Sequence, residues 1–227
     1  MIELKNLVAG AEIEAPGEDL VSIGYTLAFD SLEGNQLPDA LTNFRAKIAL
    51  NNLNAIALAK FSNQSMFADP ATNPVMFQAQ MMELVTEVFA NNPEIQVEDF
   101  GFELGEQINM SMHGSLSFAN NALANPMVMQ NPFMLLNEII SDINLDFSQG
   151  LLSFALDSFI ENQMDDAQLA EESRPQFEAQ MRAQIQMGLD QSIQAGFLIK
   201  ESDQYRVKAA MSNGSLEVNG IPVPLPF

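Results

Sequence analysis

Strict two-residue alternation of apolar and polar side chains is the feature that most restricts what this chain can fold into. Over residues 108–118 every second residue is apolar or small, and polar side chains such as Ser111 and His113 lie between. Successive side chains of a β-strand point to opposite faces of a sheet, so this pattern predicts a half-buried antiparallel strand. In 95–104 the apolar positions change parity after Val97, which predicts a β-bulge at the two acidic residues that follow. Four further segments alternate in the same way: 23–29, 44–50, 143–147 and 205–211.

Helix signals lie between these strand segments. Asn73–Pro74 and Asn131–Pro132 each combine an N-cap residue with a proline in the first helical turn. Ser148 is the candidate cap of a third helix. The longest helix is expected over about 175–194, where an apolar side chain recurs every four residues, and Gly196 is its expected stop.

The order of these elements predicts the fold class. Three short strands joined by turns are expected after the longest helix, and Asn213–Gly214 is typical of a type I′ hairpin. Runs of adjacent alternating strands favour an antiparallel sheet. The sequence therefore predicts an α+β protein, an extended twisted antiparallel β-sheet with amphipathic helices packed on one face. We expect a single domain over 1–227, with possible sub-blocks 1–120 and 121–227 that share the sheet.

The charge distribution argues against one class of partner. The formal net charge is -21, and the stretch 61–173 contains 17 Asp and Glu but no Lys or Arg. Nucleic acids and anionic lipid surfaces are bound through clustered cations that neutralise phosphates. We therefore expect no nucleic-acid partner and no direct binding of this segment to an anionic membrane. Cysteine is absent, which excludes disulfides and thiolate chemistry.

Two constellations that could carry chemistry have simpler interpretations. His113 is the only histidine, and the polar strand residues around it provide no carboxylate to orient it, which favours a solvent-facing side chain. Asp142, Asn144 and Asp146 have the spacing that opens a calcium loop, but Phe147 stands where that loop needs glycine. We interpret the three residues as the polar face of a strand, with a loosely bound Ca²⁺ as the alternative.

Paired carboxylates raise the alternative of a hydrolase. The pairs are Glu98–Asp99, Asp165–Asp166 and Glu171–Glu172. Adjacent residues of a strand point to opposite faces, and the last two pairs lie in a polar connector, so solvated charge is the favoured interpretation. No P-loop, dinucleotide-binding, serine-hydrolase or zinc-protease motif occurs. The sequence thus favours a protein that is not an enzyme and needs no cofactor or metal.

Two segments carry a family resemblance, 196–225 near the C-terminus and 29–58 in the first half. The segment 196–225 resembles the end of the YdgA-like family of Gram-negative bacterial envelope proteins, and 29–58 looks like that family's middle region. The matching elements at the C-terminus are Gly196, Tyr205, Gly214, Leu216, Val218, Asn219 and Gly220.

The resemblance implies a compartment rather than a reaction. Members of that family look periplasmic and are usually tethered to the inner membrane by an N-terminal segment, which we expect to be missing from this chain. The apolar stretches here, such as 151–156, fall far short of the roughly 20 residues that a membrane-spanning helix needs. The family has no established biochemical function, so no catalytic residue can be transferred.

Methionine and phenylalanine supply the candidate binding residues. Methionines cluster at 75–82 and 126–134, and flexible thioether side chains can line an adaptable apolar site. Ordinary core packing is the favoured alternative because the spacing is helical, and a Cu(I) site at Met127 and Met129 is a third. The candidate hydrophobic ligand surface comprises Phe77, Met81, Met82, Phe133 and Met134.

The sequence therefore predicts a non-enzymatic periplasmic domain that serves in cell-envelope maintenance. Its expected partner is an unidentified envelope protein or an acyl-bearing, hydrophobic ligand, held in a groove or at a sheet edge. A purely structural or assembly module with no small ligand is the alternative.

Overall fold

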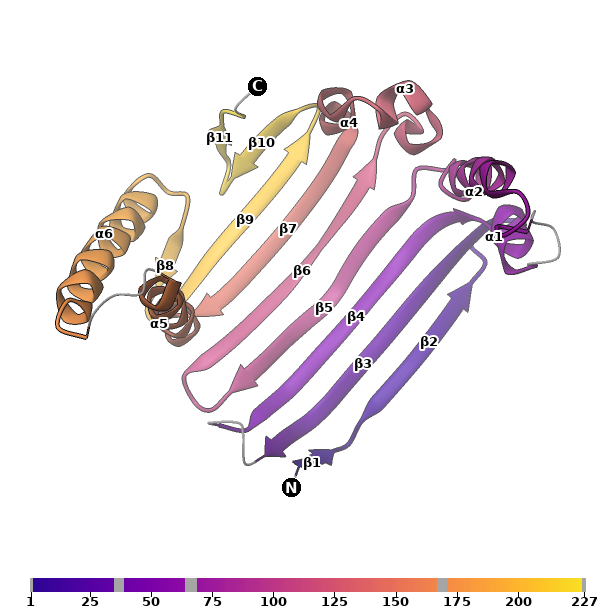
Figure 1. Cartoon of the computed structure of the whole chain (residues 1–227). Coiled ribbons are helices and arrows are strands. Elements are labelled where there is room, and N and C mark those ends of the chain that lie inside the picture. The colour runs from indigo at the N-terminus through magenta and orange to yellow at the C-terminus, as the bar shows by residue number, and fades with distance from the viewer. Residues whose placement is uncertain (1, 35–38, 64–68, 167–170, 226–227) are drawn as a thin grey trace.

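One antiparallel β-sheet runs through the whole described chain, which comprises residues 2–34, 39–63, 69–166 and 171–225 of this computed structural model (Figure 1). Its strands are β1 (Ile2–Lys5), β2 (Val8–Glu14), β3 (Leu20–Gly34), β4 (Leu41–Asn54), β5 (Glu94–Leu104), β6 (Ile108–Phe118), β7 (Ile139–Ser148), β8 (Ile199–Glu201), β9 (Gln204–Ser212), β10 (Ser215–Val218) and β11 (Ile221–Val223).

The strand order is β1-β3-β4-β5-β6-β7-β9-β10-β11. At one edge β2 also pairs with β3, and near the other edge β8 also pairs with β9. Sequential strands therefore lie side by side almost everywhere, as antiparallel connections favour.

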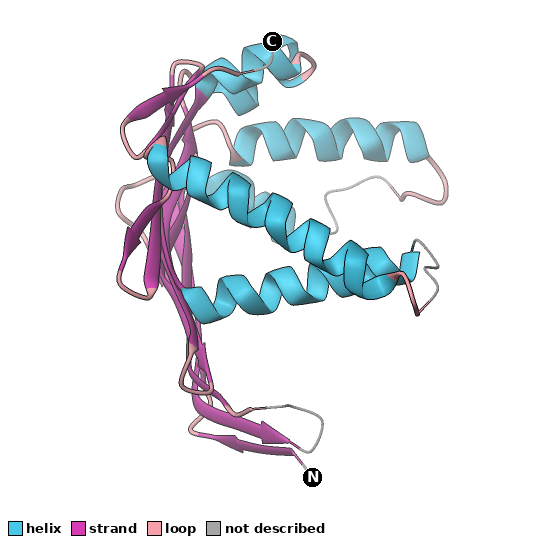
Figure 2. Cartoon of the chain, turned by 90° about the vertical axis from the view of Figure 1, so that its left-hand side faces the viewer, coloured by secondary structure: helices cyan, strands magenta, loops and turns pink. Residues whose placement is uncertain are grey.

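Helices are inserted between the strands in three pairs. They are α1 (Ala55–Ser62) and α2 (Pro74–Val88), α3 (Pro126–Met129) and α4 (Pro132–Glu138), and α5 (Gln149–Asp166) and α6 (Arg174–Gln194). A short 3₁₀ helix, η2 (Ala122–Ala124), precedes α3. Seen along the sheet, the described helices project from one face and the other face carries none (Figure 2).

Polar side chains cap the helices where the sequence predicts. The Asn73 side chain accepts a hydrogen bond from the Met76 amide at 3.2 Å, and Asn131 accepts one from the Phe133 amide at 3.1 Å. Each asparagine satisfies an amide that the first helical turn leaves unpaired. Both predicted helix starts are thus confirmed.

The main buried cluster joins the α1–α2 pair to the sheet. Val21, Leu53, Ala57, Leu84 and Val88 are buried together, and residues of β3 and β4 pack against them. Elsewhere the interior is thin, in the sense that few large side chains are fully buried. Among the described residues the large side chain that is fully buried is Ile160 of α5, 1 % exposed.

The predicted fold class is confirmed: the protein is α+β, with an open antiparallel sheet and helices on one face. The bulge is confirmed too, because the register between β5 and β6 shifts between Val97 and Phe100. Local sequence patterns did not predict β1, β2, β11, α1, α3 or η2. β1 alternates over only four residues, Ile-Glu-Leu-Lys, and β2 has no polar face before Glu12.

We expect one cooperative unfolding transition. β6, which ends the sub-block 1–120, pairs along its length with β7 of the sub-block 121–227, so neither block keeps its sheet neighbours alone. Differential scanning calorimetry should show a single peak. Two well-separated peaks would show that the blocks unfold independently.

Candidate binding surface

The face of the sheet that bears the helices is apolar across its centre. Strand registers align two neighbouring rows of side chains from β3 to β9, which we call the apolar sheet face. Neither row contains a charged residue. The rows are Leu27, Ala46, Phe100, Met112, Leu145 and Val207, and Tyr25, Ile48, Val97, Gly114, Ile143 and Ala209.

Large side chains of this face remain open to solvent. Tyr25 is 52 % exposed, Leu27 43 %, Ile48 37 % and Ile143 39 %. Covering apolar surface releases about 25 cal/mol per Å² removed from water, so a contiguous exposed area of this kind favours association with an apolar partner.

The helical pairs flank the apolar sheet face and leave its centre open. α1 and α2 stand at one end of the strands, and α5 stands at the opposite end (Figures 1 and 2). Ile23 and Leu50, which belong to the next row, pack against the buried cluster of α1 and α2. The α1–α2 pair therefore covers the β3–β4 part of this neighbouring row, whereas Ile95 of β5 in the same row stays 42 % exposed.

Aromatic rings extend the apolar sheet face toward the opposite end. The rings of Phe29 and Phe44 stack with centroids 4.8 Å apart, and Phe100 meets the Phe44 ring edge-on at 6.1 Å. Such pairs add specific geometry to the burial of apolar area.

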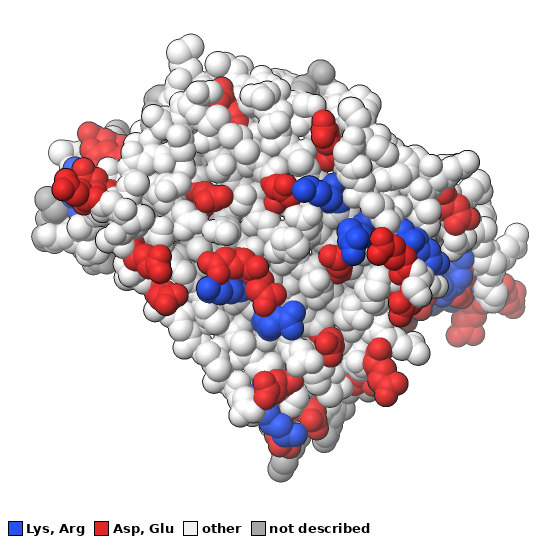
Figure 3. All heavy atoms as spheres, turned by 180° about the vertical axis from the view of Figure 1, so that it is seen from behind, with Lys and Arg blue, Asp and Glu red and all other residues white. Residues whose placement is uncertain are grey.

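The opposite face of the sheet is polar and carries matched charges (Figure 3). Eight of the nine basic side chains form ion pairs, and Lys200 lies 5.4 Å from the Tyr205 ring centroid. The pairs across the centre of this face are Arg45–Asp99 at 2.8 Å, Lys47–Glu98 at 2.6 Å, Arg206–Asp146 at 2.8 Å and Lys208–Asp142 at 3.2 Å.

These ion pairs raise the pKa of two of the cations. The hydrogen bond from Lys47 to Glu98 raises the pKa of Lys47, and the hydrogen bond from Arg206 to Asp146 raises that of Arg206. A cation whose pKa is raised on folding stabilises the fold below its unfolded pKa, and this contribution is lost as the pH rises through the folded value. Both contributions therefore persist at neutral pH and are lost only in strongly alkaline solution.

We expect no measurable binding of nucleic acid or anionic liposomes. Eight of the nine basic side chains are already engaged by carboxylates, so no cluster of unpaired cations faces a phosphate. Fluorescence anisotropy with labelled DNA and flotation with anionic vesicles, each at low and moderate salt, would check this. Binding that weakens as salt is added would show that the charge argument is wrong.

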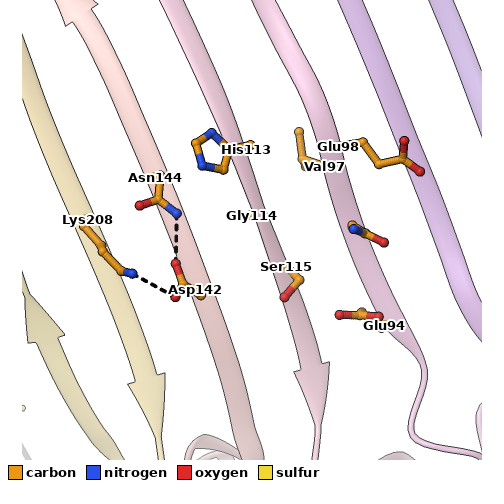
Figure 4. A pocket seen from close by; sticks show the side chains of 10 residues that line it. Glu94, Val97, Glu98, His113, Gly114, Ser115, Asp142, Asn144 and Lys208 are labelled. Carbon is orange, nitrogen blue, oxygen red and sulfur yellow. Dashed lines mark hydrogen bonds and ion pairs between the residues drawn. The ribbon is translucent and has the colours of Figure 1, made fainter.

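His113 lies on the polar face, beside a shallow pocket of about 360 Å³ (Figure 4). Asp142 accepts a hydrogen bond from the side-chain amide of Asn144 at 2.9 Å and forms an ion pair with Lys208. His113 itself is exposed, and among the described residues no hydrogen bond to its imidazole ring is found. This placement agrees with a solvent-facing strand residue.

The other polar candidates also lie on this face or in ion pairs. Asp142, Asn144 and Asp146 line the polar side of β7, where Lys208 and Arg206 engage the two carboxylates. Within the described ranges no group of three or more His, Cys, Asp or Glu is placed to hold a metal ion.

The structure places the five predicted ligand-surface residues on helices rather than on the sheet. Phe77, Met81 and Met82 belong to α2, whereas Phe133 and Met134 belong to α4 of another helical pair (Figure 1). Met82 is 58 % exposed, Phe133 57 % and Met134 42 %, while Phe77 and Met81 are half-buried. Their role in binding stays a prediction. The alternation in the strands indicates which residues share the apolar sheet face, but it does not indicate that this face is exposed.

A pocket of about 950 Å³ adjoins the β5–β6 turn and the start of α5. Its apolar lining residues are Leu104, Ile108 and Phe154, and its carboxylates are Asp39, Glu106, Asp157 and Asp203. The four carboxylates would repel an anionic group. No sequence pattern indicates this pocket, because its residues come from separate segments.

The C-terminal residues that carry the family resemblance have structural roles. Gly196, with φ of +80°, follows the end of α6, and Asn213–Gly214 has positive φ at both residues, as a type I′ turn requires. Asn219 donates hydrogen bonds to the Gly196 and Phe197 carbonyls at 3.0 and 3.1 Å. This asparagine therefore ties the β10–β11 turn to the end of α6.

None of the helices in the described stretches is long and apolar enough to cross a membrane.

Comparisons with known proteins identify a family. No curated protein and no solved structure matches the chain. A family model described as "Bacterial protein of unknown function (DUF945)" matches residues 1–226. The chain therefore belongs to the DUF945 family of bacterial proteins.

Proposed function

We propose that this chain is a non-enzymatic periplasmic binding domain that holds an acyl-bearing, hydrophobic ligand on its apolar sheet face. The observation that carries the proposal is the exposure of Tyr25, Leu27, Ile48 and Ile143 in two rows without a charged side chain. An acyl chain gains free energy from removing such surface from water and makes no demand for hydrogen bonds.

The proposal also covers the compartment of the protein and the cellular process in which it serves. Both follow from a finer family assignment. We place the chain in the YdgA-like group of envelope proteins, tethered to the inner membrane in its full-length form. The C-terminal glycines and Asn219 support this, because they shape the turns and the helix end that the resemblance rests on. In this setting the ligand would be an envelope lipid, and the process cell-envelope maintenance.

The ion pairs support a binding role over a hydrolytic one. The β-bulge turns both Glu98 and Asp99 to the face opposite the apolar rows, so the expectation that the two point to opposite faces is wrong. Lys47 and Arg45 hold them there at 2.6 and 2.8 Å. General acid–base catalysis by two carboxylates needs one of them protonated and both facing the scissile bond. These two carboxylates instead neutralise cations on a polar surface.

A protein partner is the second candidate, favoured by the width of the apolar sheet face. Its rows cross six strands, and neighbouring strands lie about 4.8 Å apart, so the rows span roughly 24 Å. That width accommodates several acyl chains side by side, or an amphipathic segment of an envelope protein. A structural module with no small ligand is the remaining alternative.

Leu27→Glu and Thr26→Glu form a matched pair that tests the proposal. The two residues are adjacent in β3 and point to opposite faces, so each variant adds the same charge to the same strand. We expect wild type to bind a fluorescent fatty-acid probe saturably. Leu27→Glu should weaken binding about tenfold or more, because the new carboxylate would be desolvated beneath the acyl chain.

Thr26→Glu should leave the affinity unchanged, because its side chain lies on the polar face. Equal loss in both variants would show that the site is elsewhere. Absence of saturable binding to the wild type would favour a protein partner or the structural module. Circular dichroism of both variants checks that they fold.

A further inference from the structure

The two edges of the sheet differ in how they are protected. The edge opposite β2 consists of β11, which is short and contains Pro222, and of the three-residue β8, which contains Lys200. Proline cannot donate a hydrogen bond to another strand, and lysine discourages pairing at an edge. The edge at β2 is seven residues long, fully exposed and free of proline, lysine and arginine (Figure 1). An unprotected edge strand is a template for another strand.

Apolar exposure is concentrated at the β2 edge as well. Ile13 is 73 % exposed, Val8 57 % and the neighbouring Leu7 54 %. Across β2, Ala9, Ala11 and Ile13 share a face with Leu27, Tyr25 and Ile23 of β3, so they continue the helix-bearing side outward. A strand added at β2 would therefore extend that side of the sheet.

We propose that β2 pairs antiparallel with β2 of a second copy of this chain, about a two-fold axis at Ala11. This register places Val8 opposite Glu14 of the second copy, Ala9 opposite Ile13, and Gly10 opposite Glu12. All seven residues of the strand are paired, and no glutamate faces a glutamate directly. On the helix-bearing side Ala9 faces Ile13 and Ala11 faces Ala11, so apolar residues remain opposite apolar residues there.

Other registers lose one of these properties. A shift of two residues in one direction sets Glu12 opposite Glu12 of the second copy, and like charges directly opposite destabilise a sheet. The same shift in the other direction leaves Ile13 and Glu14 facing residues before the strand. A shift of one residue places the apolar side chains on the polar face.

The surroundings of the edge tolerate two carboxylates. Lys47 lies close enough to Glu12 and Glu14 for both to contribute to the rise of its pKa.

The two-fold axis of the proposed dimer runs perpendicular to the sheet, so both copies present their helices on the same side. The dimer therefore joins two apolar sheet faces into one continuous surface.

Gly10 offers a matched pair of charge variants. A Cβ built on Gly10 meets no heavy atom within 4 Å, so side chains at this position fit the monomer. In the proposed register each copy's residue 10 faces Glu12 of the other. Gly10→Glu therefore creates two like-charged pairs, whereas Gly10→Lys creates two opposite-charged pairs.

Analytical ultracentrifugation of the full chain over a concentration series tests the proposal. We expect wild type to form a dimer. Gly10→Glu should raise the dimer dissociation constant about tenfold, and Gly10→Lys should leave it unchanged or lower it. Val75→Glu, at an exposed position of α2, is the control for added charge and should behave as wild type.

Three results would overturn the proposal. A wild type that sediments as a monomer at every concentration excludes the dimer. Equal loss in Gly10→Glu and Gly10→Lys shows that pairing does not use this register. A dimer that Leu27→Glu disrupts, and Gly10→Glu does not, would place the interface on the apolar sheet face.

Discussion

Replacing Leu84 by alanine is expected to lower the free energy of unfolding by about 2 to 5 kcal/mol, the range for truncating a buried leucine. Leu84 is 5 % exposed and belongs to the cluster with Val21, Leu53, Ala57 and Val88. That cluster attaches α1 and α2 to the sheet, and the remaining interior of the described chain is thin. Few neighbours can move to fill the cavity, so the loss should lie in the upper part of the range.

Met82→Ala, on the same helix, is the matched control. Met82 is 58 % exposed, so its truncation should change the free energy of unfolding by no more than about 0.5 kcal/mol. Urea denaturation followed by circular dichroism measures both values. Similar losses for the two variants would show that α2 does not pack on the sheet as described.

Ser148→Ala is expected to lower the free energy of unfolding by about 1 to 3 kcal/mol. Ser148 is 2 % exposed, and its hydroxyl oxygen accepts hydrogen bonds from the Asn109 amide at 3.0 Å and the Leu151 amide at 3.1 Å. The first contact joins the ends of β6 and β7, and the second caps α5. Alanine would leave both amides without this acceptor in a buried place.

Ser148→Thr keeps the hydroxyl and should retain more of the stability than alanine does. Ser153→Ala, at an exposed position of α5, should change the free energy of unfolding by no more than about 0.5 kcal/mol. Thermal melts of the three variants under identical conditions compare them. A Ser148→Ala protein as stable as wild type would show that the two hydrogen bonds contribute nothing.

Local signals in the sequence predicted much of the fold. The alternation over 108–118 coincides with β6, and the parity change after Val97 identified the bulge in β5. Asn73 and Asn131 cap the helices that they were expected to cap. These features depend on neighbouring residues, so periodicity and capping chemistry are sufficient to find them.

Two of the elements that were missed, β2 and α1, lack such local contrast. In β2 the two faces carry Ala9 and Ala11 on one side and Val8 and Gly10 on the other, so no side reads as polar until Glu12. Helix α1 begins directly after β4, capped by Asn54 without a proline or a turn to announce it. Neither amino-acid composition nor hydrophobic periodicity distinguishes β2 or α1 from its surroundings.

The candidate site depended on a property that periodicity does not contain. The alternation indicates which residues share a face, but whether helices lie flat on that face or stand at its ends depends on tertiary packing. Here the helices stand at the ends, so Tyr25 and Ile48 are exposed although they alternate as core residues do. The methionine clusters of α2 and α4 are visible in the sequence itself, so they were the candidates for a hydrophobic ligand surface.

Photocrosslinking with a diazirine-bearing fatty acid, followed by mass spectrometry, tests the central claim most directly. We expect the label to enter peptides of β3 and β4 around Tyr25, Leu27 and Ile48, and unlabelled fatty acid to compete with it. Labelling confined to α2 and α4, at residues such as Met82 and Phe133, would contradict the central claim. So would labelling that unlabelled fatty acid does not reduce.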